Sequence, residues 1–169
     1  MLAYSEYNYY ICAIQPINVR LVESEARLLA AQKEADFLAK VDELQRIAIA
    51  HGLVYKTTDI CKMAAREPAK RFYIDAKTAL EQYCKYRKGE SVIQKKECRK
   101  MYAEIFSRFE RLMTLKRVTG QKVVMHELME EVLESEAPSF YYEEGSAVKM
   151  YYRFMSRKRE RDRKRQIRK

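Results

Sequence analysis

The chain has 169 residues, of which 47% are hydrophobic and 34% charged, enough for one ordinary domain or two very small ones. This apolar content argues against wholesale disorder, and only 4 glycines and 3 prolines are present to form the turns of a many-stranded β fold. The net charge is +10, and residues 157–169, with nine basic and two acidic side chains, account for +7 of it. We therefore predict an all-α protein with a basic C-terminal tail.

Residues 1–17 are predicted to form an N-terminal arm that contains Tyr4, Tyr7, Tyr9 and Tyr10. These aromatic side chains either pack on the domain or dock on another subunit. The arm lacks the basic region and the long apolar run of a secretory signal, and no stretch approaches the roughly 18 apolar residues of a membrane span. The expected location is therefore the cytoplasm, which means the host cytoplasm or the virion if a phage encodes the protein.

Two divergent copies of one pattern follow, offset by 68 residues. The matching positions are Phe37 with Ile105, Val41 with Phe109, Leu44 with Leu112, Gly52 with Gly120, and Phe72-Tyr73 with Phe140-Tyr141. The apolar positions have the spacing of one helix face, and each glycine follows a long helix, where a left-handed residue commonly ends it. We predict two tandem three-helix modules, at 18–88 and 89–156, that either share one core or abut, with the apolar faces of both long helices in the seam. The tail occupies 157–169.

Shorter signals predict local structure inside the first module. Its long helix is expected to begin near Asn18, and Thr58 or Asp59 is expected to cap the short helix that follows. Asp75 is expected to cap the last helix. Residues 53–55 and 72–74 are predicted to pair as a very small ribbon.

Motifs that carry chemistry are missing from the sequence. It contains no phosphate-binding glycine loop, no H-E-x-x-H and no G-x-S-x-G. The four cysteines form no C-x-x-C pair, and neither histidine has a ligand partner at helical spacing. Four glutamates (Glu127, Glu130, Glu131 and Glu134) share one helix face, which is either solvated or a surface for a basic partner. We expect a protein that is not an enzyme, with no catalytic residues, no cofactor and no metal site.

The clustered cations indicate a nucleic-acid partner, because arginine binds phosphates in a bidentate manner and a cationic segment suits a polyanion. The candidate binding residues are Arg157, Lys158, Arg159, Arg161, Arg163, Lys164, Arg165, Arg168 and Lys169 in the tail, and Lys77, Lys85, Arg87 and Lys88 in the first module. The alternative interpretation of the tail is a solvated, charged helix end. The tyrosines of the two Phe-Tyr segments either stack on bases or lie in the core.

A short helix, a turn and a second helix occur in each copy and are loosely similar to a helix-turn-helix unit. Two departures weaken this similarity. The connection at about 67–75 is longer than the usual turn, and Glu143 and Glu144 begin the second helix of the second copy, where they would repel phosphate. Binding to the nucleic-acid backbone without sequence preference is therefore expected.

Each Phe-Tyr motif has Ala and Pro shortly before it and a helix after it, at Pro68–Ala79 and Ala137–Ala147. This pattern resembles small helical proteins of gut-bacterial tailed phages (crAss-like) and mobile elements. The resemblance implies either a DNA-binding accessory protein or a virion component such as a ring or connector subunit. Two hypotheses therefore stand: nucleic-acid binding, mainly through the tail, and a structural role in association with other protein subunits or further copies of the chain.

Overall fold

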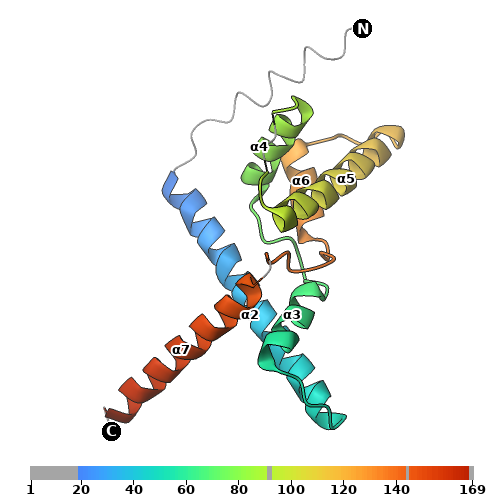
Figure 1. Ribbon diagram of the computed structural model, residues 1–169. Coiled ribbons are helices and arrows are strands. Elements are labelled where there is room, and N and C mark those ends of the chain that lie inside the picture. The colour runs from blue at the N-terminus through green and yellow to red at the C-terminus, as the bar shows by residue number, and fades with distance from the viewer. Residues whose placement is uncertain (1–18, 91–92, 144, 168–169) are drawn as a thin grey trace.

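A computed structural model describes residues 19–90, 93–143 and 145–167. The described chain consists of six helices: α2 (Val19–Ala50), α3 (Thr57–Arg66), α4 (Ala76–Arg87), α5 (Lys96–Val118), α6 (Met125–Glu134) and α7 (Ser146–Ile167) (Figure 1). The predicted all-α class is confirmed. The predictions for the arm at 1–17, the cap at Asn18 and the last two cations, Arg168 and Lys169, lie outside the described residues.

The long helices end where the glycines predict. Gly52 and Gly120 have φ angles of +65° and +68°, in the left-handed region that favours glycine. After α2, the Leu53 N–H donates back to the Ala48 carbonyl at 2.8 Å, which closes the last turn of the helix.

One of the predicted caps is correct and one is wrong. The Asp75 carboxylate accepts a hydrogen bond from the Thr78 N–H at 2.7 Å and caps α4 as expected. For α3, the capping position is Lys56, which makes no side-chain capping bond. Helix α3 begins earlier than predicted, so Thr58 and Asp59 lie within its first turn.

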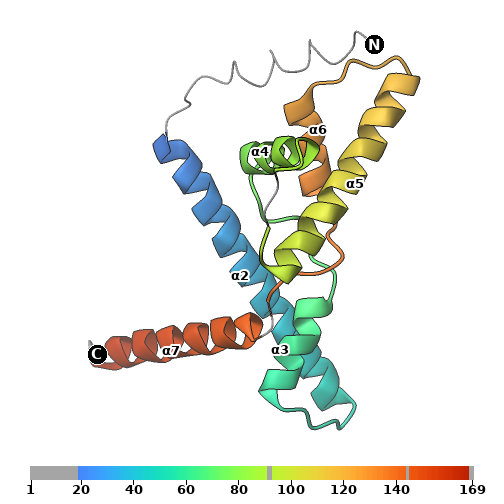
Figure 2. The same cartoon turned by 45° about the horizontal axis from the view of Figure 1, so that its top comes forward.

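The helices pack in two clusters that do not follow chain order (Figures 1 and 2). Helices α2, α3 and α7 form one cluster, and α4, α5 and α6 form the other. Helix α4 therefore packs on helices of the second half, whereas α7 packs on helices of the first. Packing thus crosses the predicted module boundary at 88/89. It also differs from a helix-turn-helix unit, in which two consecutive helices pack on each other, because α3 and α4 belong to different clusters.

The two connections that follow α3 and α6 run between the clusters and pair with each other. Ala69 and Ala137 form an antiparallel bridge in which each N–H donates to the other carbonyl at 2.8 Å. The predicted ribbon between 53–55 and 72–74 is wrong, because 53–55 form an exposed turn and the pairing involves the alanines beside the two prolines.

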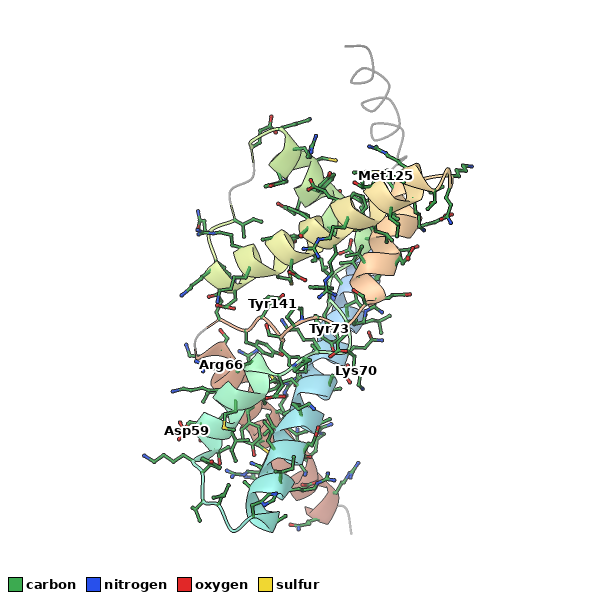
Figure 3. All side chains as sticks on the ribbon, turned by 90° about the vertical axis from the view of Figure 1, so that its right-hand side faces the viewer. Asp59, Arg66, Lys70, Tyr73, Met125 and Tyr141 are labelled. Atoms are coloured by element: carbon green, nitrogen blue, oxygen red, sulfur yellow. The ribbon has the colours of Figure 1, made fainter. Side chains whose placement is uncertain are left out.

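Aromatic side chains beside this bridge interlock the two halves. Phe72 stacks on Tyr141, and Tyr73 stacks on Phe140, each pair with ring centroids 6.2 Å apart. Figure 3 shows Tyr73 and Tyr141 in the middle of the molecule, between the helices of the two clusters. The predicted shared core is confirmed: one cluster of buried side chains contains residues of both long helices. They are Phe37, Val41, Ile105 and Phe109, with Leu44 and Leu112 packed against them.

Candidate nucleic-acid interface

The basic tail forms the C-terminal half of α7. Seven of its nine predicted cations are described, and all seven are exposed: Arg157, Lys158, Arg159, Arg161, Arg163, Lys164 and Arg165. In both ribbon views this part of α7 extends away from the two clusters and ends at the C-terminus (Figures 1 and 2). The cations are therefore presented on a projecting helix.

Local sequence explains why the tail is helical. No glycine or proline follows Gly145, and Glu160 and Lys164 form an i,i+4 ion pair at 2.8 Å with the acid N-terminal, the favourable orientation. The hydrogen bond from Lys164 lowers the pKa of Glu160. At the start of the tail, Arg157 forms an ion pair with Glu34 of α2 at 2.5 Å. This contact ties the tail to the body of the protein.

The second set of predicted cations lies on α4 and is less prominent. Lys85, Arg87 and Lys88 are exposed, whereas Lys77 is half-buried. Arg87 lies 3.6 Å from the Glu110 carboxylate of α5, which offsets part of its charge. Because α4 belongs to the other cluster and the tail points away from it, the structure does not gather the two sets into one surface.

The structure adds one cation that the sequence prediction missed. Arg153 is exposed and lies four residues before Arg157 on the same uninterrupted helix. Residues four apart share a helix face, so Arg153 extends the basic face by one turn toward the body. Helical spacing in the sequence places Arg153 on this face, whereas charge density alone starts the tail at Arg157.

The prediction that Glu143 begins the last helix is wrong. Helix α7 starts at Ser146, after Gly145 with its φ of +78°. The Glu143 carboxylate accepts a hydrogen bond at 2.8 Å from the N–H of Glu97, in the first turn of α5. Glu143 thus caps the N-terminus of α5 and not that of α7, and a carboxylate at this position is stabilised by the helix dipole.

Two cations of the body are committed to the fold. Burial lowers the pKa of Lys33 to about 8, while the Cys98 thiol acts to raise it. The Lys33 ammonium group lies 4.3 Å from the centre of the Tyr142 ring. Arg108 donates to Glu104 at 2.7 Å, to the Ser135 hydroxyl at 2.9 Å and to the Glu136 carbonyl at 2.7 Å. Neither side chain is placed to serve as a phosphate contact.

The tyrosines of the Phe-Tyr segments belong to the core. Besides its stacking on Phe140, Tyr73 donates a hydrogen bond from its hydroxyl to Asp36 at 2.7 Å, and burial raises its pKa. Tyr141 stacks on Phe72, and burial raises its pKa as well. Of the two interpretations of these tyrosines, the packing favours core residues over base-stacking platforms.

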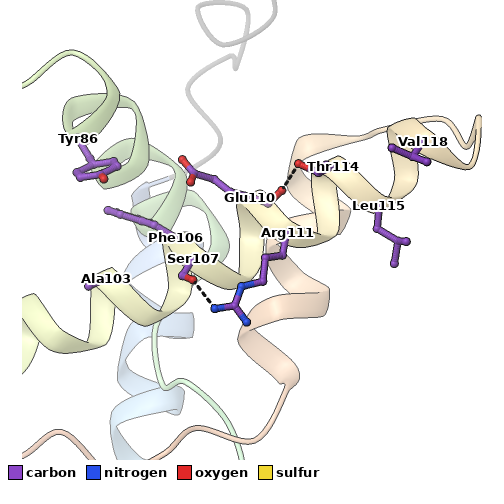
Figure 4. Close-up of a pocket in the computed structure, with 9 residues that line it drawn as sticks. All are labelled: Tyr86, Ala103, Phe106, Ser107, Glu110, Arg111, Thr114, Leu115 and Val118. Carbon is purple, nitrogen blue, oxygen red and sulfur yellow. Dashed lines mark hydrogen bonds between the residues drawn. The ribbon is translucent and has the colours of Figure 1, made fainter.

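A groove of about 660 Å³ lies on the surface of α5 beside α4 (Figure 4). Its apolar lining includes Tyr86, Phe106 and Leu115. Two of its polar contacts run along α5, because Arg111 donates to the Ser107 hydroxyl at 3.1 Å and the Thr114 hydroxyl donates to the Glu110 carbonyl at 2.8 Å. The Glu110 carboxylate instead pairs with Arg87 of α4.

No family model, curated protein or solved structure matches this chain. Across 19–90, 93–143 and 145–167, no group of three or more His, Cys, Asp or Glu side chains is arranged to hold a metal ion. Within the same ranges, no helix combines the length and the apolar character needed to span a bilayer.

Proposed function

We propose that the protein binds the phosphate backbone of DNA or RNA through the C-terminal half of α7, without sequence preference. The observation that carries this proposal is a face of an exposed, projecting helix that holds five cations and one acid, Glu160, which is paired with Lys164. The cations lie at i, i+4, i+8, i+11 and i+12: Arg153, Arg157, Arg161, Lys164 and Arg165. These spacings place them on one side of the helix.

The dimensions of this face suit a polyanion. At about 1.5 Å per residue, the array from Arg153 to Arg165 is about 18 Å long. Duplex DNA carries one negative charge per roughly 1.7 Å of axis, so a helix of this length lies opposite several phosphates at once. An α-helix with side chains is about 10–12 Å across, which matches a major groove about 12 Å wide. Lys85, Arg87 and Lys88 of α4 provide a weaker, separate contact.

We further infer that the body arose by duplication of a three-helix module whose third helices have been exchanged. Helices α3 and α6 begin and end at positions 68 residues apart, and the same offset relates Ala69 to Ala137. Two further hydrogen bonds support the relation: Phe72 N–H donates to the Leu133 carbonyl and Phe140 N–H to the Ala65 carbonyl. In this account α4 completes the second module, α7 completes the first, and the basic tail continues α7.

A second candidate function is that of a structural subunit in a larger assembly, such as the ring or connector of a tailed phage that the resemblance of the Phe-Tyr motifs implies. One observation favours it. The turn between α2 and α3 exposes several apolar side chains, among them Val54, which is 99% exposed. Exposed apolar residues gathered in one place are typical of protein contacts.

Fluorescence anisotropy tests the nucleic-acid proposal. The full-length chain is titrated into a labelled short duplex and a labelled single strand at low salt, and compared with a variant in which Arg157, Arg161, Lys164 and Arg165 are changed to Gln. We expect more than about a tenfold loss of affinity for both ligands. The matched control changes Lys77, Lys85, Arg87 and Lys88 to Gln, which removes the same charge from α4.

The control separates a local interface from a general charge effect. A small loss in the α4 variant and a large one in the α7 variant is the expected result. Equal losses assign the binding to net charge and reject an α7 interface. An intact chain that does not bind at low salt rejects nucleic-acid association altogether.

A further inference from the structure

The α2–α3 turn forms an apolar projection with a basic border. Leu53, Val54 and Tyr55 of the turn are exposed, and so is Met63 further along α3. The exposed charged side chains that follow the turn along α3 are Lys56, Lys62 and Arg66, the last residue of the helix, with Asp59 as the acidic one. We name this surface the α3 end. Figure 3 shows Asp59 and Arg66 on the side of α3 that faces away from α2.

The corresponding surface of α6 carries the opposite charge. Its exposed side chains are His126 and the four glutamates that the sequence placed on one helix face, Glu127, Glu130, Glu131 and Glu134. Beside them, between α5 and α6, lies an open groove of about 460 Å³ with an apolar lining of Leu112, Leu115 and Val132. We name this surface the α6 end. In both ribbon views, α3 and α6 lie in different parts of the molecule, one in each cluster.

The charged side chains that line the groove have partners in the same chain, and the partner of Arg111 is an uncharged hydroxyl. Glu131 forms an ion pair with Lys116 at 2.8 Å, and Arg111 donates to the Ser107 hydroxyl. Arg108, which also lines the groove, is held by Glu104 and by the end of α6. Glu130 and Glu134 lie one turn apart on the exposed face of α6, and Glu130 also lies 3.5 Å from the His126 ring.

The two ends match position by position. With the 68-residue offset, Lys62 corresponds to Glu130 and Arg66 to Glu134, while the apolar Met63 corresponds to Glu131. Three equivalent places are thus basic or apolar on α3 and acidic on α6, whereas the fourth, Asp59 and Glu127, is acidic on both. Two copies of the α6 end repel each other, as do two basic borders, whereas an α3 end and an α6 end are complementary.

We propose that the protein self-associates head to tail, with the apolar turn at the α3 end of one copy docked in the groove at the α6 end of a second copy. Lys62 and Arg66 then face Glu130 and Glu134. Because the two surfaces differ and lie on different clusters, the contact is heterologous. Such contacts build rings or open filaments rather than closed two-fold dimers. This association involves neither the tail nor nucleic acid.

Multi-angle light scattering of the nuclease-treated, full-length chain over a range of concentrations tests the proposal. We expect species whose masses are multiples of the 20.2 kDa chain, and more of them as concentration rises. The variants K62E/R66E and E130K/E134K should each weaken association more than about tenfold, because each opposes like charges across the contact. The control K85E/K88E changes the same charge on α4 and should associate as the unchanged chain does.

Mixing the two variants gives the sharper result. The acidic α3 end of K62E/R66E complements the basic α6 end of E130K/E134K, and the remaining pair of ends is unchanged, so the mixture should regain the large species. A chain that stays monomeric at every concentration overturns the proposal. So does association that neither charge reversal weakens, or a mixture of helical, folded variants that does not recover. Anisotropy on the same variants keeps the tail hypothesis separate, because neither variant alters α7.

Discussion

Replacing Phe140 by Ala should destabilise both helix clusters at once. Phe140 is 3% exposed and lies between elements of both halves. Its ring is 5.6 Å from Phe37 of α2 and 6.2 Å from Tyr73, and its N–H donates to the Ala65 carbonyl at 3.2 Å. Removing a buried Phe side chain costs about 3–5 kcal/mol, a large part of the roughly 5–15 kcal/mol that stabilises a typical domain.

The free energy of unfolding is measured by urea denaturation, followed by circular dichroism and by tyrosine fluorescence. We expect a single, coincident transition in the parent and in Phe140→Ala, with the midpoint of the variant shifted to lower urea. The control Ile49→Ala removes an apolar side chain that is 76% exposed and should change stability by less than about 0.5 kcal/mol. A loss below about 1 kcal/mol for Phe140→Ala, or two separate transitions, would refute the interlocked core.

Three further experiments test local features. Asp75→Ala should lower the free energy of unfolding by about 1 kcal/mol because it removes the cap of α4. Thr58→Ala should leave it nearly unchanged because Thr58 caps no helix. Equal losses for the two variants in urea denaturation would contradict the cap assignment. Burial lowers the pKa of Lys33 to about 8, so the unfolded chain binds more protons than the folded chain above that pH, and stability should rise from about pH 8 toward pH 10. Lys33→Met should lack this rise, and an identical pH dependence in both proteins would argue against a buried ammonium group. Cys61 is fully buried and its pKa is raised to about 11 by burial, so in timed alkylation at mild pH it should react only on unfolding; modification of Cys61 in the folded protein would contradict its placement.

The sequence predicted the helices well because their signals are local. Apolar side chains at helical spacing, a glycine after each long helix and the carboxylate of Asp75 each act over a few residues. The cap of α3 was misplaced because Thr58 is a good capping residue, yet the helix already begins at Thr57, after Lys56. A good capping residue therefore identifies the first residue of a helix only when no other residue within one turn can take the capping position.

The partner of each third helix could not be predicted. Helix α4 buries Ala79 and Tyr83, and the apolar sequence pattern that could receive such a face occurs once in each half of the chain. Tyr83 packs on Phe106 and Phe109 of α5, with ring centroids 5.3 and 4.9 Å away. Local periodicity is equally compatible with packing of α4 on the first half of the chain and with the packing on the second half that the structure has.

The candidate interface was predictable in charge but not in extent. The density of Lys and Arg identified the tail, whereas Arg153 joins the basic face only through the continuity of α7. The cations of α4 were grouped with the tail because both are basic, yet they lie on the other cluster. Glu143 was assigned to the nearest following helix, although its carboxylate caps α5, 46 residues away along the chain.

The salt dependence of binding tests the α7 interface most directly. The affinity for a labelled duplex is measured by anisotropy over a series of salt concentrations, and the logarithm of the association constant is plotted against the logarithm of the salt concentration. A face of five contacts predicts a slope of about −4 to −5, at roughly −0.9 per neutralised phosphate. Changing Arg157, Arg161, Lys164 and Arg165 to Gln should bring the slope to about −1. A slope that the four substitutions leave unchanged would contradict binding through α7.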